Sequence, residues 1–309
     1  MRHQISKKIQ LAALAIVIGA TGCKKPAEAP PAEAPPAEAV AAPEAATATA
    51  AAAPKAARTE FKALDPAEIA ALKTKAAGWQ QLLPTPGEVF DAMAAMNKEA
   101  GGTVQWAALV TDRTIAADAD RAAVAVAVGR SIADFLVLVH AQQAERAAPL
   151  AEQLLAAADR LGVGEQAREK GAALVPALQK SDWASTGAAV ASIFEAMRAE
   201  LTGKRADEQT ALLIAVGVWL EGIRVVATHL GTTPNEATSG LLHQGHLAQF
   251  FAARLEGLQG PLAASPAVAS LKAPLVAIGK AMAGSHSDPL TAEAVASIGS
   301  AATEALAKL

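Results

Sequence analysis

The sequence predicts an all-α fold, a multi-helix bundle of about ten helices. Ala, the strongest helix former, supplies 82 of the 309 residues, whereas aromatic residues supply only 3%. No segment shows convincing strand-like alternation between turn dipeptides. The run AVAVAVG at 123–129 alternates, but its small residues also suit a helix. Five dipeptides join an N-capping residue to Pro, which is favoured at the first helical position: Asp65-Pro66, Thr85-Pro86, Thr233-Pro234, Ser265-Pro266 and Asp288-Pro289.

Residues 1–22 have the layout of a signal peptide. Three basic residues lie within the first eight positions, residues 11–18 are apolar, and three small residues precede Cys23. This ending resembles the lipobox of bacterial lipoprotein precursors, and the resemblance covers residues 1–23 only. It implies that the signal is removed and that Cys23 is acylated, with palmitate among the usual acyl groups. Membrane lipid would then be a partner through acylated Cys23.

Residues 23–60 are predicted to be a lipidated Cys followed by a disordered linker. PAEAP occurs at 26–30 and again at 31–35, and no residue here could build a core. Alternating Pro favours an extended tether. Lys24 stands where some lipoproteins carry the Asp that retains them at the inner membrane. The resemblance therefore implies the outer membrane of a bacterial envelope, facing the periplasm.

Residues 61–309 form the predicted helical domain. Gly162, Gly203 and Gly231 stand where helices are expected to end. Apolar spacing between the start and stop signals places the helices. They are expected near residues 66–82, 86–99, 119–143, 145–160, 164–179, 182–202, 207–229, 234–257, 266–283 and 291–308.

An internal similarity suggests that this domain contains a duplicated helical unit. Residues 120–129 read DRAAVAVAVG and residues 208–217 read EQTALLIAVG, which is an offset of 88 positions. The pentapeptide AVASI also occurs twice, in later parts of the same two halves. The predicted repeats are 119–203 and 206–309.

Residues 122–139 and 211–227 are apolar nearly all round, which is typical of buried helices. Each segment carries charged residues, so neither is predicted to span a membrane. Gly129 and Gly217 occupy equivalent places in the two segments. Because Gly in a helix interior costs about 0.5–1 kcal/mol, we expect that the two helices approach closely at these glycines.

Four charged residues on these two helices are candidates for a ligand pocket. Arg130 and Asp134 are spaced i,i+4, and Glu221 and Arg224 are spaced i,i+3, so each pair could form on its own helix. Buried charges need partners or water. Two interpretations stay open, namely a polar pocket between the repeats and structural ion pairs at the rim of the core.

Three histidines form a candidate metal site. His243 and His246 are spaced i,i+3 on the helix expected to begin at residue 234, and His229 lies near the end of the preceding helix. Two imidazoles on one face can start a metal site, but a further ligand is required. The alternative is that these are surface or capping histidines, which are favourable near a helix C-terminus.

The sequence lacks the motifs of well-known enzyme classes: it has no GxSxG, GxxxxGK[ST], HExxH or CxxC. Its 27 Lys and Arg do not exceed its 30 Asp and Glu, which disfavours nucleic acid as a partner. We therefore expect a non-enzymatic, lipid-anchored cell-envelope protein without a cofactor, whose helical domain binds another envelope protein or a cell-wall component. The alternative is a periplasmic helical protein that binds a small ligand or a metal. An enzyme with scattered site residues is a third hypothesis.

Overall fold

The computed structural model describes residues 104–203, 207–232, 242–283 and 289–309, together with 93–94, 96–98 and 102. The predicted signal peptide, acylated Cys23 and linker lie outside the described residues. So do the helix expected at 66–82 and most of the helix expected at 86–99.

The all-α prediction is confirmed, since the described part of the chain is helical and contains no strand. The alternating run at 123–129 lies inside a helix. The helices are α3 (Trp106–Leu109), α4 (Arg121–His140), α5 (Ala144–Leu161), α6 (Gly164–Gly171), α7 (Leu174–Gln179), α8 (Trp183–Thr202), α9 (Glu208–Thr232), α11 (Gly245–Glu256), α12 (Gly260–Ala263), α13 (Pro266–Ala281) and α14 (Ala292–Ala307).

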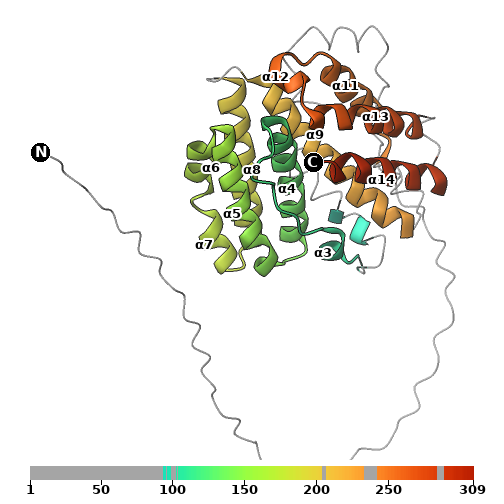
Figure 1. Ribbon diagram of the computed structural model, residues 1–309. Coiled ribbons are helices and arrows are strands. Elements are labelled where there is room, and N and C mark those ends of the chain that lie inside the picture. The colour runs from blue at the N-terminus through green and yellow to red at the C-terminus, as the bar shows by residue number, and fades with distance from the viewer. Residues whose placement is uncertain are drawn as a thin grey trace, which may run out of the picture. The chain divides into compact units, whose positions relative to one another are not determined.

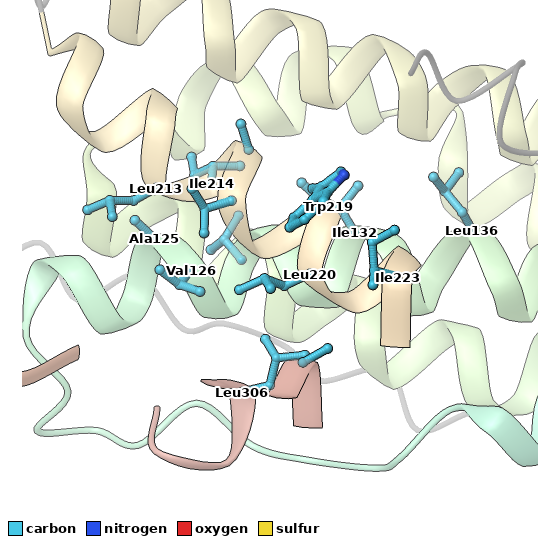
Figure 2. Close-up of a cluster of buried hydrophobic side chains, with 14 of the residues drawn as sticks. Ala125, Val126, Ile132, Leu136, Leu213, Ile214, Trp219, Leu220, Ile223 and Leu306 are labelled. Carbon is cyan, nitrogen blue, oxygen red and sulfur yellow. The ribbon is translucent and has the colours of Figure 1, made fainter. Parts of the chain in front are cut away.

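Helices α4 and α9 pack against each other at the centre of the domain (Figure 1). On one side, α5 and α8 pack against α4, with α6 and α7 outside them; on the other, α14 packs against α9, followed by α13 and α11. Figure 2 shows apolar side chains of α4 and α9 meeting, joined by Leu306 from α14. This arrangement explains why both segments are apolar nearly all round, because each is covered from several directions.

The two central helices cross at the glycines that the sequence singled out. A Cβ atom on Gly129 would lie 1.9 Å from the backbone oxygen of Ile214, and one on Gly217 would lie 2.1 Å from that of Val126. The prediction of close approach is therefore confirmed. The contact is also reciprocal, since Ile214 and Gly217 stand 88 positions after Val126 and Gly129. A pair of helices related by a two-fold axis makes reciprocal contacts of this kind. The duplication of 119–203 and 206–309 stays a prediction.

Length and composition would allow two described helices to cross a membrane. They span Arg121–His140 and Glu208–Gly231, and their most apolar windows have a mean hydropathy of 2.0 and 1.8. Within the domain, 94% and 83% of those windows are buried against other helices. Their apolar character is thus that of core helices in this fold.

One predicted helix is divided in two, and one predicted start signal is wrong. The segment 164–179 is split into α6 and α7, because Pro176 has no N–H and its ring clashes with the carbonyl four residues earlier. The Asp288-Pro289 signal is wrong, since Pro289 does not start a helix, although the helix expected at 291–308 is present. Instead α14 begins at Ala292, and the Thr291 hydroxyl caps it by accepting from the Ala294 N–H. The Ser265-Pro266 signal is confirmed, since the Ser265 hydroxyl accepts from the Ala267 N–H.

Candidate functional site

Glu221 and Arg224 form a structural ion pair, as one of the two sequence interpretations proposed. The Arg224 Nε donates to Glu221 Oε1 at 2.8 Å, and its Nη2 donates to the backbone oxygen of Leu109 at 2.5 Å. The exposed fractions of the two residues are 2% for Glu221 and 8% for Arg224. The pair is hydrogen-bonded and ties the end of α3 to α9, so these charges are compensated within the protein.

Arg130 and Asp134 behave differently, although they too lie one turn apart on one helix. No ion pair joins them, and Arg130 makes no hydrogen bond to any described residue. The Nε of Arg130 and the Oδ1 of Asp134 are buried without a partner. The two residues are only 6% and 5% exposed. The expectation that this pair satisfies itself on its own helix is wrong, because the side chains do not meet.

Both residues line a cavity of about 600 Å³. It lies between α4, α5, residues 110–114 and the end of α14. This is a usual size for a small-molecule site, for which about 300–1,000 Å³ is typical. Ser131 and Gln153 add polar groups, and the Oε1 of Gln153 is also buried without a partner. The apolar part of the lining includes Val110, Leu138, Pro149, Leu150 and Leu306.

Two further arginines line the cavity, but both have protein partners. Arg146 donates to the backbone oxygens of Ala107 at 2.6 Å and Val110 at 3.0 Å, and it forms an ion pair with Asp112. Arg113 donates to the backbone oxygen of Leu306 at 3.3 Å. These bonds hold the segment before α4 against α5 and α14. Among the three arginines, Arg130 is the one that is both buried and without a bonded partner.

The environment of Asp134 favours its protonated form. Burial raises its pKa to about 8, helped by the charge of Glu221 and by a hydrogen bond between the two carboxyl groups. The positive charges of Arg224 and Arg130 oppose this shift but do not cancel it. Burial also lowers the pKa of Arg130. At neutral pH, Asp134 is therefore mostly a neutral acid, and the positive charge of Arg130 is not balanced beside it.

The raised pKa predicts how stability depends on pH. Between the ordinary pKa of 3.8 and about 8, folded Asp134 holds a proton that the unfolded chain releases. The contribution of this group to stability is therefore greatest at low pH and is lost as the pH rises through about 8. We expect Asp134→Asn, which resembles the protonated form, to lose less unfolding free energy than the wild type between pH 5 and pH 9 in urea titrations. Asp118→Asn, at an exposed position, is the control, and equal losses in all three proteins would contradict the prediction.

The structure does not place His243 and His246 on one face of a helix. A tight turn, in which the Gln244 N–H donates to the Leu242 oxygen at 2.8 Å, precedes α11, and α11 begins only at Gly245. His243 thus lies before the helix, and the predicted i,i+3 relation on the helix is wrong.

His229 lies in the last part of α9, beside an aromatic ring. Its ring centroid is 5.7 Å from that of Trp106, and the ring centroid of His140 lies at the same distance from Trp106. Burial lowers the pKa of both histidines, which favours neutral imidazoles. Among the described residues, no three His, Cys, Asp or Glu side chains are grouped so that they could hold a metal ion. The arrangement gives no support to a metal site at His229, His243 and His246.

The sequence identified two of the cavity residues, Arg130 and Asp134, but missed others. Arg113, Arg146 and Gln153 lie on separate segments, and only the tertiary packing brings them to the cavity. The sequence shows only that charged or polar residues recur on α5 and before α4. This pattern is common on solvent-facing surfaces, so it does not point to a cavity. No family model, curated protein or solved structure matches this chain.

Proposed function

We propose that this chain is a bacterial envelope lipoprotein, anchored through acylated Cys23, whose helical domain binds a small polar ligand in the cavity beside α4. Of the two functions that the sequence left open, this is the ligand-binding one. The protein acts by binding, from the periplasmic face of the outer membrane, and the linker at 23–60 lets the domain reach away from the membrane.

One observation carries the proposal. A guanidinium that is 6% exposed and has no anionic partner within hydrogen-bond distance is costly, because burial removes its hydration. Proteins compensate such charges by pairing them, as this protein does for Arg224. Arg130 instead lines a cavity and forms no ion pair with a described residue. A bound anion would supply the missing partner of its guanidinium.

Filling the cavity should abolish binding. We expect at least one class in a panel of L-amino acids, short carboxylates, primary amines and inorganic phosphate to raise the melting temperature of the full-length protein. Leu150→Trp, which places an indole in the cavity, should remove that rise. Leu154→Trp is the matched control, since Leu154 is a partly buried residue one turn further along α5 that does not line the cavity.

Two results would contradict the proposal. One is that no compound in the panel stabilises the wild type. The other is that Leu150→Trp responds as strongly as Leu154→Trp does. The interaction or scaffold function would then be favoured, and crosslinking in intact cells would identify the envelope partner.

A further inference from the structure

We infer that the ligand of this cavity is a small anion with a tetrahedral oxyanion group, which is inorganic phosphate or a small phosphate ester. The inference rests on the proposed ligand-binding function and names the chemical class of its ligand. It follows from the hydrogen-bond donors that reach the cavity and from the positive charge that the protein leaves unbalanced there.

Two buried residues of α4 present donors to the cavity. Arg130 makes no hydrogen bond to a described residue, and among its nitrogens Nε alone is fully enclosed by protein atoms, so its terminal nitrogens reach the cavity that it lines. Ser131 is 3% exposed and lines the same cavity. Its hydroxyl is not fully enclosed and makes no hydrogen bond to a described residue. Both groups can therefore donate to one ligand.

Gln153 adds a donor from α5. Its Oε1 is enclosed, whereas its Nε2 is not and has no hydrogen bond to a described residue. Asp134 offers the ligand no acceptor in return, because its Oδ1 is enclosed and its carboxyl group shares a hydrogen bond with Glu221. The ligand must therefore present acceptors to these donors.

The cavity carries two positive charges that no carboxylate balances. Arg146 is paired with Asp112, and the environment of Asp134 favours its neutral form. Arg113, from the segment before α4, donates to a backbone oxygen and forms no ion pair with a described residue. It lies close enough to Arg130 for its charge to lower the pKa of Arg130. Arg113 and Arg130 together match a doubly charged ligand.

The positions of the donors suit a tetrahedral group. They come from α4, from α5 and from residues 110–114, so they approach a ligand from more than one direction. A carboxylate presents two oxygens in one plane, whereas a phosphate group presents its oxygens at the corners of a tetrahedron. Guanidinium groups bind phosphate oxygens through paired N–H donors. The volume of about 600 Å³ leaves room for a small organic group beside Pro149 and Leu150.

The test is calorimetric titration of the full-length protein at pH 7 with inorganic phosphate, glycerol 3-phosphate, sulfate and acetate. We expect phosphate and sulfate to bind at least about tenfold more tightly than acetate, because acetate leaves charged hydrogen bonds unmade. Glycerol 3-phosphate distinguishes the two sources of the oxyanion. Tighter binding than that of phosphate identifies an ester as the ligand, and equal or weaker binding identifies the free ion.

Substitutions in the cavity separate a binding role from a structural one. Arg130→Met should weaken phosphate binding at least about tenfold. It should leave the melting temperature of the unliganded protein unchanged or raise it, because it removes a buried charge that has no bonded partner. Ser131→Ala should weaken binding roughly fivefold. Arg168→Met removes an exposed arginine outside the cavity and should bind phosphate as the wild type does.

The pH dependence of sulfate binding gives an independent readout, because sulfate keeps its charge between pH 7 and pH 9. Burial and Glu221 raise the pKa of Asp134 to about 8, so a rise in pH places a carboxylate near the bound anion. The affinity for sulfate should therefore fall by up to about tenfold over this range in the wild type and stay constant in Asp134→Asn. The charged groups around Asp134 are Glu221 and Arg224 on α9 and Arg130 on α4, with Asp112, Arg113 and Arg146 lining the same cavity.

The outcomes separate this inference from the proposed function. If acetate or another compound of the panel binds in the cavity more tightly than phosphate and sulfate, the inference is wrong and the ligand-binding function stands. Equal phosphate binding by Arg130→Met, a lowered melting temperature of that variant, or a sulfate affinity that does not change with pH would also contradict the inference. If nothing in the panel binds, both are wrong.

Discussion

We expect Gly217→Ala to destabilise the helical domain by about 3 kcal/mol. The added Cβ would lie 2.1 Å from the backbone oxygen of Val126 and 3.0 Å from the backbone nitrogen of Arg130. Backbone atoms of α4 cannot turn aside as a flexible side chain can. The methyl group therefore forces α4 and α9 apart and disturbs the packing along the whole crossing.

The same substitution at Gly222 is a matched control. Gly222 lies five residues further along α9, and a Cβ there would meet nothing within 4 Å. Since Ala is the better helix former by about 0.8–1 kcal/mol, Gly222→Ala should stabilise the domain slightly. Urea unfolding of the two variants should thus shift in opposite directions. A Gly217→Ala midpoint at or above that of the wild type would show that the helices do not meet at their glycines.

Cys23→Ser should release the protein from membranes. If Cys23 carries the acyl chains that the lipobox resemblance implies, its loss removes the whole anchor, since each buried methylene contributes about 0.8 kcal/mol to membrane binding. We expect the variant in the soluble fraction after cell lysis and the wild type in the membrane fraction. Metabolic labelling with palmitate should mark the wild type only.

Lys24→Ser serves as the control, because it changes the neighbouring residue and keeps the thiol. It should stay in the membrane fraction and retain the label. A Cys23→Ser protein that still sediments with membranes after a salt wash would contradict the lipoprotein interpretation. That result would leave the ligand cavity untouched, because the cavity residues all lie in the described helical domain.

Local signals in the sequence were sufficient for much of the fold. The fold class, most helix bounds and the cap at Ser265 depend on short-range rules of propensity and hydrogen bonding, and these rules held. Where a predicted helix differed from the observed one, another local preference of the chain opposed helix formation. Pro176 broke a helix that its flanking residues would have continued, and a tight turn at residues 242–244 interrupts the helix expected over 234–257.

The cavity could be predicted only in part. The sequence placed Arg130 and Asp134 on a buried helix, which made them candidates, but Arg113, Arg146 and Gln153 come from other segments. A cavity is the space that several elements leave between them, so it depends on small displacements of whole helices. No pattern along one helix records those displacements.

By itself, the sequence determined that the domain is helical and that two apolar helices approach at Gly129 and Gly217. A buried helix must be apolar nearly all round, and a glycine inside a helix lowers stability unless close packing requires it, so both features can be recognised from the residues. Only the tertiary structure decided which of the two charged pairs is satisfied. Both spacings allow a pair on one helix. The carbonyl of Leu109 at the end of α3 completes the bonding of Arg224 to Glu221. Asp134 turns to Glu221 for a hydrogen bond, and Arg130 lines a cavity where the protein supplies no partner.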